Sequence, residues 1–259
     1  MSERVVVITG ASGGIGAALA ERLAVSGVSL VLVARRADAL EAVAARCVGM
    51  GAHAGIAAPL CVTADVTSRA AVQGVVADAL ARFGGIDVWV NNVGQGISRM
   101  PSELTDDDID EMISVNVKSA LYGMQETLPH FRARGAGQVI NVSSMLGRMP
   151  FAVQRSAYCG SKHFLNSLTQ NFRAEVQQTH PGIQVTLVSP GVVRTDFGNN
   201  ARYGGVDSRT MPDSQSAEEV AAVIADVMES RAPDVYTRVG AQGRVAAFYA
   251  AIGTDPTDA

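Results

Sequence analysis

Tyr158 and Lys162 are the residues whose types and spacing most directly suggest chemistry. On a helix, residues four positions apart lie on the same face, so the phenol and the ammonium group can be neighbours. The pKa of a free tyrosine is about 10, too high for a proton acceptor near neutral pH, and a nearby fixed cation lowers it. Tyr158 could then give a proton to a carbonyl oxygen or take one from an alcohol.

Two serines and an asparagine add polar groups to the same predicted region. Ser143 and Ser144 stand at the end of a predicted strand, where open parallel sheets bind ligands. Either hydroxyl could bond the substrate oxygen that Tyr158 contacts. Asn116 falls inside a predicted helix although asparagine is a poor helix former, which indicates a structural water or a functional role.

A glycine-rich turn at residues 9–16 separates the first predicted strand from the first predicted helix. Glycines at this place let the backbone turn sharply and approach a pyrophosphate, while the helix N-terminus supplies amide donors and positive potential. Such a turn can also form without a ligand, but its position between a strand and a helix favours dinucleotide binding.

The end of the second predicted strand indicates which dinucleotide is bound. An acidic residue there typically accepts hydrogen bonds from the ribose hydroxyls of NAD(H). In this sequence Ala34 is followed by Arg35 and Arg36. An acid would repel a 2′-phosphate, whereas a guanidinium binds it with paired hydrogen bonds. We therefore expect NADP(H) rather than NAD(H); the alternative is that the arginines, Arg36 above all, are simply solvated.

Short β-branched runs alternate with longer alanine-rich segments of helical period. The runs predict buried strands at 5–9, 29–34, 59–63, 86–91, 138–143 and 183–189. The predicted helices between them are 15–26, 37–50, 68–83, 105–134 and 156–178. Apolar strands alternating with helices imply a parallel sheet covered on both faces, and right-handed crossovers make it doubly wound. We expect an α/β fold of three layers with a doubly wound parallel sheet.

One domain, 1–259, accounts for the whole pattern. Residues 4–190 form its expected cofactor-binding and catalytic core. Residues 191–215 mix Gly, Asn, Arg, Ser and Pro with little periodicity, and we expect them to form a substrate loop. Residues 216–253 predict a helix, a strand and a helix at 217–230, 234–237 and 243–252.

Composition and charge exclude several classes of function. The 259 residues are 47% hydrophobic and 18% charged, with a formal net charge of −4. This balance offers no extended basic surface for nucleic acid, and no apolar run approaches the ~18 residues of a membrane span. The first residues lead straight into an apolar strand without a charged leader and cleavage site, so we expect a cytoplasmic protein. The three cysteines share no metal-ligand spacing, and we expect no metal site.

Taken together, these motifs resemble the short-chain dehydrogenase/reductase family, in its compact single-domain type with a Rossmann fold. The resemblance covers residues 4 to about 248. The matching motifs are TGxxxGIG at 9–16, NNAG at 91–94 with Val93 in place of alanine, YxxxK at 158–162 and PGxxxT at 190–195. The residues that match the family's catalytic tetrad are Asn116, Ser144, Tyr158 and Lys162.

The resemblance implies that NADPH reduces a carbonyl group, with Ser144 polarising the carbonyl oxygen and Tyr158 protonating it. Lys162 would lower the tyrosine pKa and bind the nicotinamide ribose, and Asn116 would hold a water that links Lys162 to solvent. Ser144 is preferred to Ser143 because the family's serine stands three residues before a glycine that matches Gly147. The interval from Ser144 to Tyr158 is one residue longer than the family pattern, which implies a bulge within 148–155.

The resemblance also implies which residues surround the cofactor. They are Gly10, Ser12, Gly13, Gly14, Ile15, Gly16, Arg35, Arg36, Asp65, Val66, Asn92, Val93, Gly94, Tyr158, Lys162, Pro190, Gly191, Val193 and Thr195.

The substrate is less well defined by the sequence. The expected pocket residues are Gln95, Met145, Met149, Gln154, Phe197 and Tyr203, a mostly apolar set that suits a hydrophobic ketone, aldehyde or keto-ester. Arg148, Arg155 or Arg202 could bind a carboxylate or phosphate, although solvated arginines are the commoner case.

Two other functions are compatible with parts of this pattern. A catalytically silent NADP(H)-binding sensor or scaffold would need only the glycine-rich turn, but here all four tetrad positions are filled. A sugar-nucleotide epimerase or lyase would need a larger C-terminal substrate domain than the segment after Ser189 provides. The resemblance further implies a homodimer or homotetramer.

Overall fold

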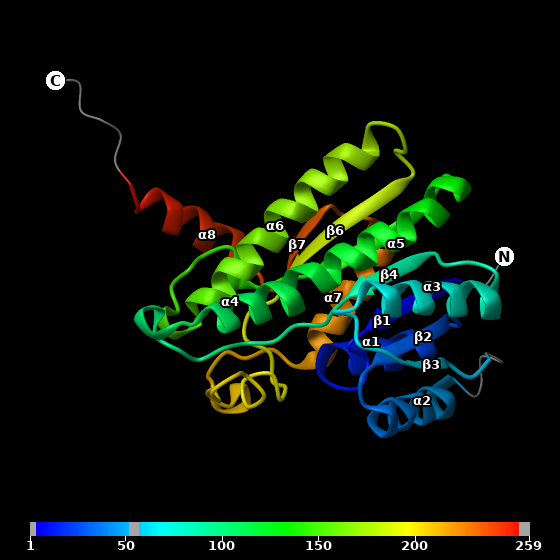
Figure 1. The fold of residues 1–259 in the computed structure, drawn as a ribbon, viewed down its shortest axis with the longest axis horizontal. Coiled ribbons are helices and arrows are strands. Elements are labelled where there is room, and N and C mark those ends of the chain that lie inside the picture. The colour runs from blue at the N-terminus through cyan, green and yellow to red at the C-terminus, as the bar shows by residue number, and fades with distance from the viewer. Residues whose placement is uncertain (1–3, 52–56, 254–259) are drawn as a thin grey trace.

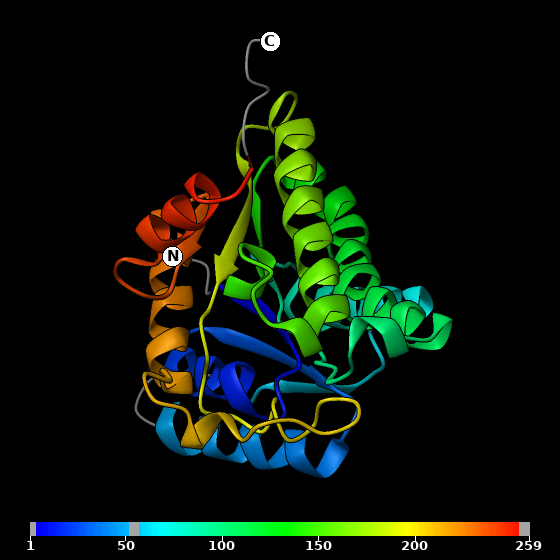
Figure 2. The same ribbon diagram turned by 90° about the vertical axis from the view of Figure 1, so that its left-hand side faces the viewer.

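A parallel β-sheet forms the centre of the molecule, and helices cover both of its faces (Figures 1 and 2). The computed structural model describes residues 4–51 and 57–253. The sheet has seven strands in the order β3-β2-β1-β4-β5-β6-β7, and each neighbouring pair is parallel. The strands are β1 (Val5–Thr9), β2 (Ser29–Ala34), β3 (Leu60–Thr63), β4 (Val88–Asn91), β5 (Gly137–Val142), β6 (Ile183–Ser189) and β7 (Asp234–Tyr236). The strand order reverses between β1 and β4, which confirms the doubly wound α/β fold.

The helices lie where the periodic segments predict them. They are α1 (Gly14–Ala24), α2 (Ala37–Gly51), α3 (Arg69–Phe83), α4 (Asp106–Ile113), α5 (Ser119–Arg134), α6 (Ser156–Gln177), α7 (Ala217–Ser230) and α8 (Ala241–Ala250). The predicted bounds of β1, β2, β6 and α7 agree with the structure, and most others differ by one or two residues at an end.

Alternate side chains of each central strand enter two separate apolar cores. Val6 and Ile8 of β1 pack on the side of α1, α2 and α7, whereas Val5 and Val7 pack on the side of α3, α5 and α6. Figure 2 shows these layers on either side of the sheet. Because both faces are covered, the central strands are apolar at successive positions, as the sequence predicts.

Strand β3 was expected to be buried, and this expectation is wrong. It is the edge strand of the sheet, and the side chains of Leu60, Cys61 and Val62 are only half-buried. An edge strand has a neighbour on one side alone, so less of its surface is covered than that of a central strand.

The helix expected over 105–134 is continuous from residue 106, but it is not α-helical throughout. Thr105 caps α4 by accepting a hydrogen bond from the Asp108 amide, and the helix then passes through a π-helical turn, Ser114–Lys118, before α5 begins. The π-turn contains Asn116, the residue that breaks the helical pattern in the sequence. Such turns are rare and often mark functional sites.

Two segments close the sheet's carboxyl edge. Residues 145–155 form two short 3₁₀ turns, Met145–Gly147 and Val153–Arg155, at the place where the sequence implies a bulge. The predicted substrate loop of 191–215 is tied down at two points, where Ile97 bridges Arg202 and Val193 bridges Gln215.

Candidate active site

The polar residues singled out in the sequence gather at the carboxyl ends of β1, β4, β5 and β6, next to the point where the strand order reverses. Open α/β sheets bind ligands at this edge. No helix within residues 4–51 and 57–253 combines the length and apolar character needed to cross a bilayer.

Tyr158 and Lys162 lie one turn apart on α6 and are both buried. Lys162 Nζ lies 5.9 Å from the centre of the Tyr158 ring and donates a hydrogen bond of 3.0 Å to the carbonyl oxygen of Val142, at the end of β5. The ring of Phe197 packs against Tyr158 with 5.5 Å between ring centres. The predicted phenol–ammonium pair is therefore present and shielded from water.

Burial dominates the acid–base properties of this pair. It raises the pKa of Tyr158 to about 12, although a hydrogen bond with Ser144 and the charge of Arg155 act to lower it. Burial likewise lowers the pKa of Lys162 to about 8. The expectation that Lys162 brings the tyrosine pKa below its ordinary value is thus not met in the protein alone, because the desolvation of both groups is the larger effect.

The two candidate serines face different surroundings. Ser144 makes a hydrogen bond with the Tyr158 phenol, and its Oγ accepts one of 3.1 Å from the amide of Leu146. Ser143 instead donates to the Oδ1 of Asn166 on α6. Of the two hydroxyls, that of Ser144 is the one placed to share a substrate oxygen with Tyr158.

Asn116 fixes the loop that follows β4. Its Oδ1 accepts a hydrogen bond of 2.9 Å from the Gln95 amide, and its Nδ2 donates one of 3.0 Å to the Gln95 carbonyl. A Cβ at Gly94 would lie 3.2 Å from this Oδ1 and 3.5 Å from Lys162 Nζ. Asn116 and Lys162 therefore flank the same glycine, and Oδ1 keeps one lone pair free for a water.

The glycine-rich turn has the backbone geometry that a bound diphosphate requires. Gly10 and Gly14 have φ angles of 68° and 54°, and a Cβ on Gly16 would lie 2.4 Å from the carbonyl oxygen of Gly10. Gly13 is the N-cap of α1 and supplies no side-chain cap, so the first amides of the helix stay available to an anion. This cradle, which a side chain would fill, fits the diphosphate of a dinucleotide.

Hydrogen bonds hold this turn against β4. Thr9 Oγ1 donates to the Val90 carbonyl and accepts from the Asn92 amide, both at 3.0 Å. Asn92 Nδ2 donates to the carbonyl oxygens of Thr9 and Gly10. In the protein alone, the predicted cofactor residue Asn92 thus shapes the turn.

The remaining predicted cofactor residues lie on both sides of the turn. A Cβ on Gly14 would lie 3.2 Å from Thr195 Cγ2, so the segment after β6 packs against the turn. Pro190 and Val193 are buried, and Gly191 faces the Arg238 side chain. Ser12, Ile15, Val93 and Gly94 are half-buried, and Val66 is buried.

Both predicted arginines lie at the open end of the turn and are exposed. A Cβ on Gly13 would lie 4.0 Å from Arg36 Nη2, so the guanidinium of Arg36 lies beside the glycines. Arg35 acts on Asp65: burial raises the pKa of that carboxyl, but hydrogen bonds from Thr67 and the charge of Arg35 bring it below its ordinary value.

The structure does not bring all six predicted substrate residues together. Gln154 and Tyr203 line an open cavity of about 810 Å³ that Arg155 also lines, whereas Phe197 covers Tyr158. Met145 and Met149 are buried in a separate apolar cluster beneath α8, against Ala241. The sequence around these methionines does not indicate that they are covered by α8, which lies close to the C-terminal end of the described residues.

Sequence reasoning missed a buried amide network below the site. Asn91 Nδ2 donates to Asn141 Oδ1 at 2.8 Å, Asn91 Oδ1 accepts from Trp89 Nε1 at 2.7 Å, and Asn141 Nδ2 donates to Thr169 Oγ1 at 2.9 Å. The signal that could have revealed it is the presence of two asparagines in strands that are otherwise apolar. The network ties β4, β5 and α6 together directly beneath the tetrad.

Comparison with known proteins decides the family. The profile of the short chain dehydrogenase family matches residues 4–204, more than two thirds of the sequence. The chain belongs to the short-chain dehydrogenase family. An uncharacterized oxidoreductase from Staphylococcus saprophyticus is 36% identical over 197 residues, which are 76% of this chain and 77% of that protein.

Solved structures of this family share the fold. Levodione reductase matches with a TM-score of 0.83 and 28% identity, covering 95% of this chain and 99% of its own. A short-chain dehydrogenase from Sphingobium yanoikuyae, solved in complex with NADPH, matches with a TM-score of 0.79 and 28% identity over 99% of both chains. Both share the doubly wound α/β arrangement described above.

Proposed function

We propose that this family member is an NADP(H)-dependent oxidoreductase that interconverts a carbonyl group and a secondary alcohol, with Tyr158 as the general acid and base. The observation that carries the proposal is the convergence of the Ser144 hydroxyl and the Tyr158 phenol next to Lys162, at the sheet edge that also carries the glycine-rich turn. When bound, the nicotinamide supplies or takes up the hydride.

The side chains of this chain would perform the proton transfer. Ser144 donates a hydrogen bond to the carbonyl oxygen, and Tyr158 donates its phenolic proton to the same oxygen as negative charge develops there. Since the pKa of Tyr158 is raised to about 12, the phenol carries its proton at neutral pH and is ready for the reductive direction. Lys162 stabilises the phenolate that remains, and a water held near Asn116 returns a proton through Lys162.

The preference for NADP(H) rests on the charges at the open end of the glycine-rich turn. Strand β2 ends at Ala34 without an acid, and Arg35 and Arg36 follow it, with the Arg36 guanidinium beside Gly13. Two cations here suit a 2′-phosphate. The NADPH complex of the Sphingobium yanoikuyae protein is consistent with this preference.

The decisive experiment is an assay of NADPH oxidation over a panel of ketones, aldehydes and keto-esters, with Tyr158→Phe as the paired variant. We expect turnover by the wild type, a loss of at least about 100-fold in the variant, and nearly equal NADPH binding by both. Turnover by Tyr158→Phe at the wild-type rate would overturn the role of this residue. NADPH binding without turnover of any compound would instead favour the sensor or scaffold.

A further inference from the structure

Arg155 is a half-buried cation beside the reacting groups that the proposed mechanism does not use. It is the last residue before α6 and precedes Tyr158 by one helical turn. Its Nη1 is buried and has no hydrogen-bond partner among the described residues, and no carboxylate within 4–51 and 57–253 forms an ion pair with it. A buried N–H group without a partner is costly, so Nη1 calls for a ligand or an ordered water to bind it.

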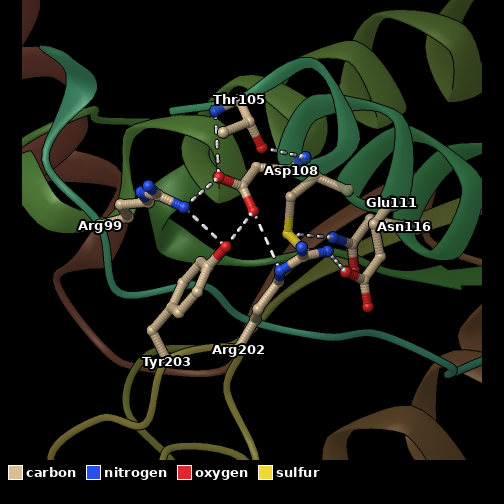
Figure 3. Close-up of polar contacts among 8 residues, drawn as sticks. Arg99, Thr105, Asp108, Glu111, Asn116, Arg202 and Tyr203 are labelled. Carbon is tan, nitrogen blue, oxygen red and sulfur yellow. Dashed lines mark hydrogen bonds and ion pairs between the residues drawn. The ribbon is translucent and has the colours of Figure 1, made fainter. Parts of the chain in front are cut away.

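The other two arginines that the sequence suggests as substrate handles, Arg148 and Arg202, are already paired with carboxylates. Arg148 pairs with Asp234. Arg99 and Arg202 both bind the buried carboxylate of Asp108, at 3.1 and 2.9 Å, and Arg202 also pairs with Glu111 (Figure 3). The hydroxyl of Tyr203 donates a further hydrogen bond of 2.9 Å to Asp108.

This cluster balances its own charges. Two arginines face two carboxylates, and the contacts fix the loop that carries Arg202 and Tyr203 onto α4. Arg155 therefore contributes one positive charge that this part of the molecule does not compensate.

Two glycines make room for the Arg155 guanidinium. A Cβ on Gly96 would lie 2.4 Å from Nη1, and a Cβ on Gly205 would lie 2.5 Å from Nη2. The same Cβ on Gly205 would lie 3.3 Å from Ser98 Oγ, so a hydroxyl stands on the same side as the guanidinium. The arrangement holds the fork of Arg155 between two loops.

The guanidinium borders the open cavity of about 810 Å³. Besides Arg155, the polar side chains that line it are those of Ser98, Gln154 and Tyr203, and the apolar ones include Met100, Val153 and Val206. The cavity therefore offers one uncompensated cation, a few neutral polar groups and an apolar wall.

The cavity adjoins the tetrad rather than enclosing it. The Phe197 ring that packs on Tyr158 also closes on Gly96, where a Cβ would lie 3.1 Å from its Cε1. Arg155 stands at the N-cap of α6, three residues before Tyr158, so the two side chains leave the helix one turn apart. A substrate that spans Tyr158 and Arg155 would therefore pass Phe197.

We infer that Arg155 binds a carboxylate of the substrate, so that the enzyme acts on oxo-acids and hydroxy-acids. The inference rests on the proposed function, since it names the substrate class of that site. A carboxylate carries the single negative charge that Arg155 lacks and accepts charge-assisted hydrogen bonds from a guanidinium. Ser98 can donate a further bond to the same oxygen atoms.

The experiment compares straight-chain oxo-acids, with none to four methylene groups between the carbonyl and carboxyl carbons, with their methyl esters. The wild type is expected to prefer one or more acids over the matching ester in kcat/KM. Arg155→Gln should reduce this acid-to-ester ratio by about 100-fold, because the charge-assisted hydrogen bonds to the carboxylate are lost, and the ester corrects for any effect on Tyr158 that both substrates share. Equal ratios in wild type and variant would overturn the inference.

Two further variants separate the guanidinium from general effects. Gly96→Ala keeps Arg155 but pushes its Nη1 away, and it should lower the same ratio. Arg46→Gln removes an equal charge from an arginine that pairs with Glu21 on the surface, and it should leave the ratio unchanged. A fall in the ratio with Arg46→Gln would show that net charge, rather than this site, sets the preference.

Calorimetric titration tests binding apart from turnover. The wild type and Arg155→Gln are titrated with the preferred oxo-acid, or with the whole series if no oxo-acid is turned over. Binding by the wild type that weakens about 100-fold in the variant supports the carboxylate site even if no carbonyl compound is reduced. In that case only the proposed reaction fails. Turnover of ketones without any preference for acids would leave the reaction standing and reject the site.

Discussion

Lys162 holds its ammonium group over the face of the Tyr158 ring, 5.9 Å from the ring centre, and neither side chain reaches solvent freely. In water this proximity would lower the pKa of the phenol. In the protein the shared burial has the opposite result, since it raises the pKa of Tyr158 to about 12 and lowers that of Lys162 to about 8. Burial therefore disfavours the charged form of both side chains, and bound ligands can offset this desolvation cost.

The depressed pKa of Lys162 predicts how stability depends on pH. Folding lowers this pKa from 10.5 to about 8, so the unfolded chain binds more protons between these values, and stability rises with pH through the window. Compared with Lys162→Met, the wild type should gain roughly 2–3 kcal/mol in free energy of unfolding between pH 7.5 and 10. Urea unfolding of both proteins at several pH values measures this change.

The other lysine of the chain provides the control. Lys118 lies in the π-helical turn with an exposed side chain, so Lys118→Met should follow the wild-type pH profile. If the free energy of unfolding changed with pH in the same way in the wild type and in Lys162→Met, burial would not destabilise the Lys162 ammonium group.

The two neighbouring serines should differ in how removal of the hydroxyl affects turnover. Ser144→Ala loses a donor to the reacting oxygen, so its kcat should fall by roughly 10²–10³-fold. Ser143→Ala leaves the Asn166 Oδ1 without its buried partner and should cost about 1–2 kcal/mol of stability while turnover is retained. Steady-state kinetics and thermal unfolding of both variants check this, and equal kinetic losses would contradict it.

Much of the fold and the site could be predicted because it depends on local pattern. The apolar runs that predict β1, β2 and β6 have the bounds seen in the structure, since buried parallel strands need apolar residues at successive positions. Gly10 and Gly14 of the turn have positive φ angles, a backbone conformation that favours glycine. The glycines themselves therefore indicate the turn in the sequence. The spacing of Tyr158 and Lys162 is likewise a property of one helix.

What the sequence could not predict depends on contacts between distant segments. The π-turn inside the predicted helix 105–134 places Asn116 against Gln95 after β4. The burial of Met145 depends on α8, nearly a hundred residues later. Which loops meet decides whether an arginine is neutralised, as Arg202 is by Asp108, or has an N–H group without a partner among the described residues, as Arg155 has at Nη1.

The cofactor preference is testable at the open end of the glycine-rich turn. Arg35→Ala and Arg36→Ala each remove a cation that suits a 2′-phosphate, so each should weaken NADPH binding by roughly 10–100-fold, as expected for loss of charge-assisted hydrogen bonds. NADH has no such phosphate, and its binding should change little. Calorimetric titration with both cofactors measures the difference, and a wild type that binds NADH as tightly as NADPH would reject the preference.

The glycine-rich turn itself gives the last prediction. A Cβ on Gly16 would lie 2.4 Å from the Gly10 carbonyl oxygen and 2.8 Å from Asn92 Nδ2, so the backbone of the turn must move to accept it. Gly16→Ala should therefore lower the free energy of unfolding by about 2 kcal/mol or more and abolish dinucleotide binding. Gly74, inside α3, has nothing within 4 Å of an added Cβ, so Gly74→Ala should raise stability by about 0.5–1 kcal/mol and leave binding unchanged. Urea unfolding and NADPH titration of the two variants separate the shape of the turn from the general effect of replacing a helical glycine; intact NADPH binding by Gly16→Ala would mean that the turn does not receive the cofactor.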